Sequence, residues 1–151
     1  MLDWREYERW MSQATKTYEL IDADIRYGGY SWACFKAHQA AELALKALLH
    51  LVGRPAFGHD ISKLLSTAAS VCSAEPGREV RLCASLLDKM YIPPRYPDAF
   101  PEGAPWEHYT REEAEAAKEC ARRIIEWVEA CASRLRSRGE EEGAGEGDRG
   151  S

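Results

Sequence analysis

Residues 30–52 form the stretch that most constrains this chain, because they read as one unbroken helix rich in alanine. A helix that is apolar over most of its surface belongs in the interior of a larger assembly. Four residues are its main polar positions, namely His38, Gln39, Glu42 and Lys46. Because a buried polar group needs a partner, each of these side chains must reach water or a specific contact.

Four further segments place apolar residues at steps of three and four, which predicts amphipathic helices over about 3–27, 60–72, 78–91 and 110–138. Asp3, Asp60 and Thr110 stand where they can cap three of these helices, and Gly53 ends the alanine-rich one. No segment alternates as a strand would. The sequence therefore predicts an all-α fold, an antiparallel up-and-down bundle of four or five helices in one domain over residues 1–138.

Two segments break the helical pattern. Residues 92–109 contain five prolines, too many for a regular helix or a central strand. Residues 139–151 are rich in glycine and glutamate, which predicts a disordered tail. This tail carries about four of the five net negative charges of the chain, so the folded body is nearly neutral. Net charge therefore does not favour unspecific binding to nucleic acid.

The apolar runs are too short to span a bilayer, and the first ten residues are unlike a signal peptide, so we expect a cytoplasmic protein without membrane contact. The five cysteines show neither CxxC nor CxxH spacing, so we expect no metal site. We interpret them as small buried apolar residues. A disulfide between Cys72 and Cys83, which flank a turn between two helices, is the alternative.

Several segments in this order resemble one known family: FKAHQAAELALKALLHLVG, then HDISKLL, YIPPRYPDA and EHYTREEAEAAKECARRIIEWV. They resemble the HEPN family (higher eukaryotes and prokaryotes nucleotide-binding), in particular its small stand-alone members from archaea and thermophilic bacteria. The resemblance implies a helical bundle that forms a homodimer. It also implies a minimal nucleotidyltransferase as partner, often in a toxin–antitoxin couple. We expect no cofactor.

Many HEPN proteins are metal-independent RNases with an arginine, four to six residues and then a histidine near the start of the last long helix. Here the residues in that region are Arg95 and His108, with twelve residues between them. Arg54 and His59 have the four-residue spacing but lie between the second and third helices. An RNase of this kind needs a base and a phosphate-binding cation, which makes His108 and Arg95 the catalytic candidates. Alternatively, Arg95 pairs with Asp98 in a turn and His108 is solvated.

His38, Glu42 and Lys46 share one strip of the alanine-rich helix. We expect a nucleotide- or phosphate-binding site made by Lys46, Arg95, Tyr96 and His38. Its expected supporting residues are Glu42, Asp98 and His59. The alternative is a buried Glu42–Lys46 pair that only fixes how the proline-rich loop or the last helix docks.

Three functions remain open at this point. The first is a HEPN dimer that binds a nucleotide or RNA phosphate and partners a nucleotidyltransferase. The second is a metal-independent RNase that uses Arg95 and His108. The third is a helical interaction module with no ligand of its own.

Overall fold

The structure is a computed structural model that describes residues 1–148, and every regular element in that range is helical. The α-helices are α1 (Trp4–Arg26), α2 (Tyr30–Leu51), α3 (Ile61–Cys72), α4 (Arg78–Asp88), α5 (Pro105–His108) and α6 (Arg111–Asp148), with a short 3-10 turn η1 (Pro97–Ala99). The predicted all-α bundle is confirmed, with five helices longer than two turns. None of the described helices is long and apolar enough to cross a membrane.

Local capping explains where the helices begin. Asp3 accepts a hydrogen bond from the backbone of Glu6 at 3.1 Å, and Asp60 accepts one from Lys63 at 2.9 Å. At the start of α6, Thr110 and Glu113 hydrogen-bond reciprocally, which is the capping box that the sequence predicts. These three predicted caps are confirmed. Each depends on residues only three positions apart, which is why the local sequence predicts it.

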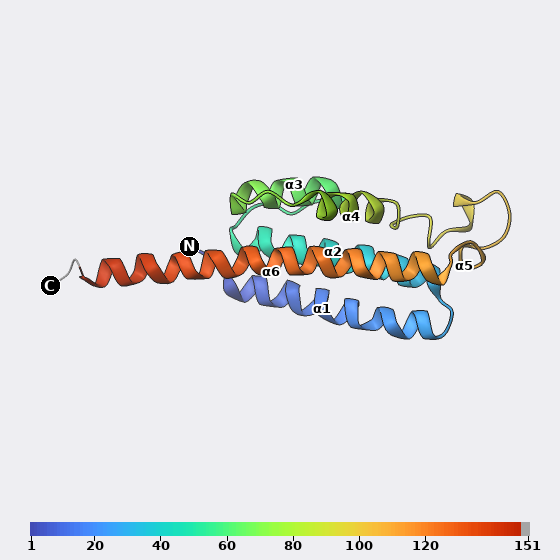
Figure 1. Ribbon diagram of the computed structural model, residues 1–151, viewed down its shortest axis with the longest axis horizontal. Coiled ribbons are helices and arrows are strands. Elements are labelled where there is room, and N and C mark those ends of the chain that lie inside the picture. Colours follow the sequence, from blue (N-terminus) through green and yellow to red (C-terminus); the bar gives the residue numbers. More distant parts are fainter. Residues whose placement is uncertain (149–151) are drawn as a thin grey trace.

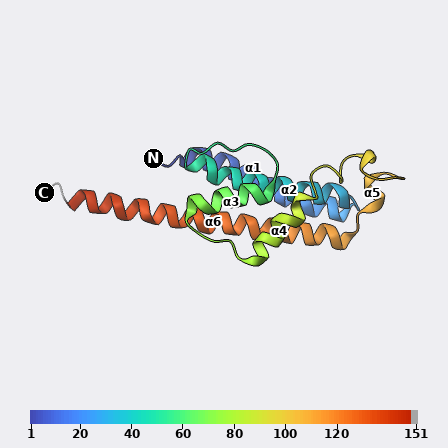
Figure 2. The same ribbon diagram turned by 90° about the horizontal axis from the view of Figure 1, so that it is seen from above.

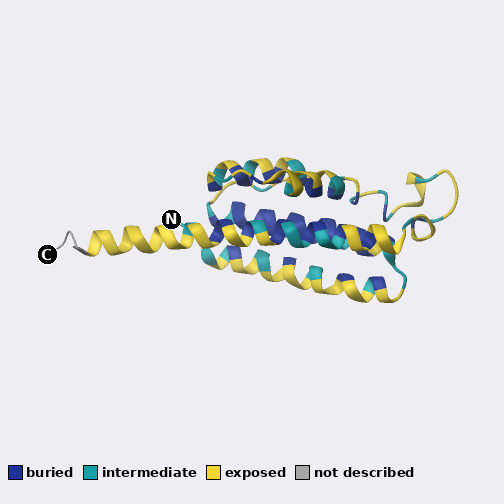
Figure 3. Cartoon of the chain, viewed as in Figure 1, coloured by how far each residue is buried: buried dark blue, intermediate teal, exposed yellow. Residues whose placement is uncertain are grey.

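Helix α2 lies at the centre of the bundle, between α1, α3, α4 and α6 (Figures 1 and 3). Its alanines pack without exposure against the neighbouring helices: Ala33, Ala37, Ala40, Ala41, Ala44 and Ala47. Such small side chains permit close approach by helices on several sides. The interior position expected for residues 30–52 is therefore confirmed.

Helix α3 departs from the up-and-down pattern, because it runs parallel to the helix before it. Residues 52–60 run back along α2, so that the backbone oxygen of His59 lies 2.8 Å from Nε2 of His38, in the middle of that helix (Figure 2). As a result α3 runs in the same direction as α2. Helix α4 then returns antiparallel to α3. The pairs α1–α2 and α3–α4 are thus two helical hairpins, and α6 packs across both.

Helix α6 extends well past the other helices (Figure 1). The expected disordered tail from residue 139 is helical up to Asp148, and residues 139–147 are all exposed (Figure 3). The helix continues there without burying any apolar side chain. The remainder of the expected tail, residues 149–151, lies outside the described residues. The boundary of the folded domain at residue 138 stays a prediction.

Four of the five cysteines form two disulfides, Cys72–Cys131 and Cys83–Cys120, with Cα–Cα distances of 6.0 and 4.8 Å. The alternative Cys72–Cys83 pairing is therefore wrong. Both cysteines face α6 rather than each other, because the α3–α4 hairpin packs its apolar side on that helix. The interpretation as buried residues holds for all five, but only Cys34 keeps a free thiol.

Candidate functional site

The polar strip of α2 is buried. His38, Glu42 and Lys46 are each at most 8% exposed, although they include two charged side chains. The Nζ of Lys46 lies 3.5 Å from Oε2 of Glu42. The buried Glu42–Lys46 pair, one of the two arrangements that the sequence allows, is thus present in the structure, and it balances the charge of the strip.

His38 is hydrogen-bonded at both ring nitrogens. Its Nε2–H donates to the backbone oxygen of His59 at 2.8 Å, and its Nδ1 lies 3.1 Å from the amide nitrogen of Gln39, which donates. Burial lowers the pKa of His38, although the His59 carbonyl and the Glu42 carboxylate act in the opposite direction. A neutral imidazole fits this arrangement. His38 therefore positions the loop before α3 and has no ring nitrogen left for a ligand.

His59 extends the strip to the surface. Its Nδ1–H donates to Oε1 of Glu42 at 2.7 Å, while its side chain remains 51% exposed. The same carboxylate thus binds Lys46 with one oxygen and His59 with the other. The Nε2 of His59 has no hydrogen-bond partner among residues 1–148, and in a neutral imidazole with Nδ1 donating this nitrogen carries the lone pair.

Tyr91 lies next to both histidines. Its ring stacks on His59 with centroids 4.4 Å apart and lies 5.0 Å from that of His38. Just before it, Asp88 accepts hydrogen bonds from the backbone of Ile61 at 2.6 Å and from the hydroxyl of Ser62 at 2.5 Å. Asp88 thereby caps the start of α3 and fixes the end of α4 beside His59.

Arg95 completes this group of side chains. Its Nε–H donates to the backbone oxygen of Tyr91 at 2.7 Å, and its guanidinium carbon lies 4.2, 4.5 and 5.0 Å from the ring centroids of Phe35, Tyr91 and Tyr96. Neither terminal nitrogen has a hydrogen-bond or ion-pair partner within the described part of the chain. We use the name Tyr91 cluster for the residues Phe35, His38, Glu42, Lys46, His59, Tyr91, Arg95 and Tyr96.

The other predicted site residues lie apart from this cluster. His108 donates from Nε2 to the backbone oxygen of Glu102 at 2.6 Å and stacks on Phe100, with centroids 4.3 Å apart. It lines a separate hollow of about 310 Å³ with Met90, Phe100 and Tyr109. Asp98 is exposed in η1 and forms no ion pair with Arg95, so the alternative turn pair is absent from the described residues.

The structure thus brings Arg95 together with His59 through Tyr91, and no contact joins Arg95 to His108 in the described range. Sequence reasoning missed Phe35, Tyr91 and Asp88. A signal for Phe35 was present, because it precedes His38 by three residues and so lies on the same side of α2. Asp88 is the last residue of α4, and Tyr91 lies three residues further on. Nothing in the local sequence indicates the long-range partners of either residue.

No group of three or more potential metal ligands occurs among residues 1–148. The groups that the Tyr91 cluster offers to a ligand are the imidazole of His59, the guanidinium of Arg95 and aromatic side chains.

Comparison with known proteins defines the class to which this bundle belongs. Residues 7–131 match the HEPN domain family, so the chain belongs to that family, and the resemblance noted in the sequence is confirmed. A comparison with curated proteins found no match.

Three solved structures resemble this chain along nearly their whole length. TT1696 from Thermus thermophilus is 41% identical with a TM-score of 0.78, and the match covers 83% of this chain and 97% of that one. ST0689, an archaeal HEPN homologue, is 40% identical with a TM-score of 0.68, covering 82% and 95%. A HEPN domain protein from Thermotoga maritima, TM0613, is 34% identical with a TM-score of 0.66, covering 83% and 98%.

Proposed function

We propose that the Tyr91 cluster binds a phosphate group of a nucleotide or of RNA. The observation that supports this most directly is which nitrogens of the Arg95 guanidinium are hydrogen-bonded. Its Nε is used to fix the guanidinium on the backbone of Tyr91, while both terminal nitrogens stay without a protein partner in the described residues. A guanidinium held in one orientation presents two parallel donors, which suits the oxygens of a phosphate.

The neighbouring aromatic side chains suit a nucleotide. Tyr96 is half-exposed and Tyr91 lies between Arg95 and His59. Aromatic rings beside a phosphate-binding arginine are the usual way in which single-stranded RNA bases are held, by stacking. Lys46, which the sequence suggested as a phosphate ligand, is buried against Glu42 and supports the site by balancing its charge.

Membership of the HEPN family supports a proposal about the partners, and the sequence supports one about the location. We propose that the chain forms a homodimer and that a minimal nucleotidyltransferase binds it, in a toxin–antitoxin-like couple in the cytoplasm. Co-expression of this chain with a nucleotidyltransferase encoded beside it tests the second part, since the two proteins should then purify together. A chain that purifies alone under low-salt conditions would count against that partnership.

The substitution Arg95→Lys tests phosphate binding. Lysine keeps the charge but loses the planar two-pronged donor, so the affinity for a fluorescein-labelled single-stranded decanucleotide should fall about tenfold. Arg81→Lys is the matched control, because Arg81 is an exposed arginine of α4 that pairs with Glu75. If Arg95→Lys lowers the melting temperature sharply and leaves the affinity intact, Arg95 is structural. If the unchanged protein binds neither RNA nor nucleotide, the interaction module is the better description.

A second candidate, a metal-independent RNase, is favoured by one contact, the hydrogen bond between His59 and Glu42. A carboxylate on Nδ1 fixes the imidazole so that Nε2 can accept a proton, as in other carboxylate–histidine pairs. His59 and Arg95 both lie within 4.5 Å of the Tyr91 ring centroid, so a base and a phosphate-binding cation flank the same side chain. His59 thus replaces His108 as the candidate base.

The reaction that this arrangement suits is transesterification of RNA. The 2′-hydroxyl oxygen attacks phosphorus while the bond from phosphorus to the 5′ oxygen breaks. Nε2 of His59 takes the 2′-hydroxyl proton and returns it to the departing 5′ oxygen, leaving a 2′,3′-cyclic phosphate and a 5′-hydroxyl end. Cleavage in EDTA should then be lost in His59→Asn and kept in His108→Asn. The reverse result would restore His108 as the base, and no cleavage by the unchanged protein would exclude the activity.

A further inference from the structure

The two disulfides are nested around the loop that carries the Tyr91 cluster. Cys83–Cys120 joins residues 37 positions apart, and Cys72–Cys131 joins residues 59 positions apart on either side of the first pair. Both connect the α3–α4 hairpin to α6. The residues between Cys83 and Cys120, the two cysteines of the inner disulfide, include the end of α4 with Asp88. They also include the whole irregular segment before α6, with Tyr91 and Arg95.

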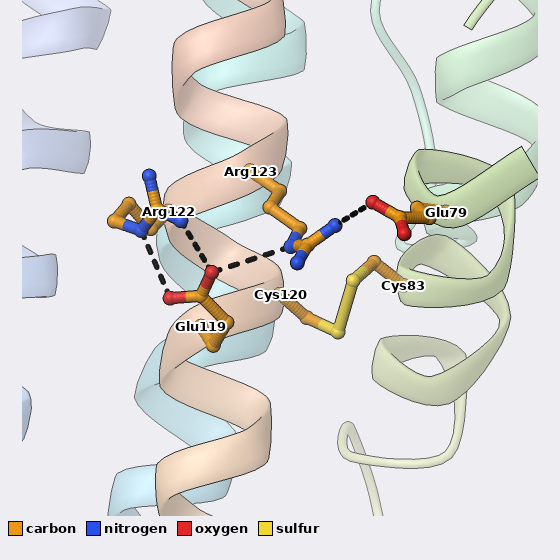
Figure 4. The surroundings of a disulfide bond; sticks show 6 residues. All are labelled: Glu79, Cys83, Glu119, Cys120, Arg122 and Arg123. Carbon is orange, nitrogen blue, oxygen red and sulfur yellow. Dashed lines mark hydrogen bonds and ion pairs between the residues drawn. A yellow bond between two sulfur atoms is a disulfide. The ribbon is translucent and has the colours of Figure 1, made fainter. Parts of the chain in front are cut away.

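The position of the loop relative to α2 depends on this attachment. The loop runs from the end of α4 to the start of α6, and the inner disulfide links those two helices covalently (Figure 4). Beyond it, Asp88 holds the start of α3, and Tyr91 stacks on His59. The covalent link therefore limits how far α4 can move from α6, and with it how far Tyr91 and Arg95 can move from Glu42 on α2.

The two disulfides differ in their surroundings. Cys72 and Cys131 are 4% and 0% exposed, whereas Cys83 and Cys120 are 7% and 8% exposed. Arg123 lies beside the inner disulfide, where it pairs with Glu79 of α4 and with Glu119 (Figure 4). The inner disulfide is thus the less buried of the two, so we expect a reductant to reach it before the outer one.

We propose that the Cys83–Cys120 disulfide is a redox switch for the Tyr91 cluster, such that its reduction releases the loop and weakens ligand binding. The proposal rests on the proposed phosphate-binding function. A dithiol reductant supplies the two electrons and two protons: one of its thiolates attacks a sulfur of the disulfide to form a mixed disulfide, and its second thiolate displaces that sulfur. The products are two protein thiols and the oxidised dithiol. Because the outer disulfide stays closed, the hairpin remains attached to α6 while its loop end loosens.

Hydrogen exchange tests the structural half on the full-length protein. Dithiothreitol is added to the concentration at which mass spectrometry after alkylation finds Cys83 and Cys120 reduced and Cys72–Cys131 intact. The amides of Ile61, Ser62 and Arg95 should then exchange about tenfold faster or more, because their hydrogen bonds lie at the loop and at Asp88. The amide of Ala33, at the start of α2, is the internal reference and should not change.

Ligand affinity tests the functional half. The labelled decanucleotide should bind about tenfold more weakly to the selectively reduced protein. The double variant Cys83→Ser, Cys120→Ser should bind as weakly and no longer respond to dithiothreitol. Cys34→Ala is the matched control and should behave like the unchanged protein, since burial raises the pKa of this free thiol to about 12 and leaves it unreactive.

The outcomes separate the two proposals. If exchange at Ile61 and Arg95 does not change when the inner disulfide is reduced, the switch is wrong whatever binds at the cluster. If exchange rises but affinity stays constant, the loop moves without controlling the site, and the switch is again wrong. If exchange rises and neither redox form binds the decanucleotide, the phosphate-binding function fails, and the switch that rests on it is overturned with it.

Discussion

Nδ1 of His59 lies 2.7 Å from Oε1 of Glu42, a contact that joins the loop before α3 to the middle of α2. Glu42 is buried and also pairs with Lys46. Glu42→Ala leaves the Lys46 ammonium buried without its counter-charge, which should lower the free energy of unfolding by about 3 kcal/mol. Urea unfolding measures this loss. Glu126→Ala, which removes an exposed glutamate of α6, is the control and should change nothing measurable. Equal stability for the two variants would mean that Glu42 is solvated.

The buried imidazole of His38 should make stability depend on pH. Burial lowers its pKa below the usual 6.5, so below that pH the unfolded chain binds a proton that the native protein excludes. The contribution is therefore fully present above about pH 6.5 and is lost as the pH falls through the native pKa, with a slope of at most about 1.4 kcal/mol per pH unit for one group. Urea unfolding between pH 7.5 and pH 4.5 should show a shallower decline for His38→Gln. Parallel curves for both proteins would contradict this account.

The cysteine pairing predicts the thiol count. Under denaturing, non-reducing conditions one thiol per chain should react, that of Cys34, and five should react after reduction. Loops of this length restrict the unfolded chain enough that full reduction should lower the stability by about 3 to 4 kcal/mol per disulfide. Five reactive thiols before reduction would eliminate both bridges.

The exposed apolar side chains predict a homodimer. Trp32 and Trp106 are 50% and 63% exposed, and Trp32 packs edge-on against Phe35 beside Arg95. Aromatic residues of this kind commonly anchor interfaces. Light scattering at micromolar concentration should give about twice the 17.0 kDa mass of the chain. Trp32→Glu should convert the dimer to monomers, whereas Leu82→Glu, at an exposed leucine of α4, should not. A monomeric mass for the unchanged protein would refute the prediction.

Removing residues 139–151 should not alter the stability of the bundle. Residues 139–147 are exposed, and glycine in a helix costs about 1 kcal/mol relative to alanine, so the extension of α6 adds no stabilising burial. Thermal unfolding followed by circular dichroism at 222 nm should give the same melting temperature for the truncated and full-length chains. A decrease of several degrees would show that the extension contacts the folded body.

The helices were predictable because their signals are local. Asp3, Asp60 and Thr110 cap residues three positions away, and the apolar stripes recur within single helices. The direction of α3 was not predictable in this way. Nine residues between α2 and α3 can span about 30 Å, enough either to reverse the chain at once or to run back along α2 first.

The site was predictable only in part for the same reason. The Glu42–Lys46 pair follows from a spacing of four residues on one helix. The contacts of Tyr91 with His59 and Arg95 depend on where the segment before α3 and the end of α4 meet, which no local pattern encodes. The cysteine partners were missed because each lies on a helix that is distant in sequence.

Nesting of the two disulfides also determines what proteolysis would do. A protease that cuts the exposed loop between α4 and α6 divides the chain into two pieces, each of which still carries one cysteine of both bridges. The nicked protein should therefore run as a single species on a non-reducing gel and as two fragments after reduction. Damage to the loop would leave the helical body assembled, with the severed ends held in place by the bonds that surround them.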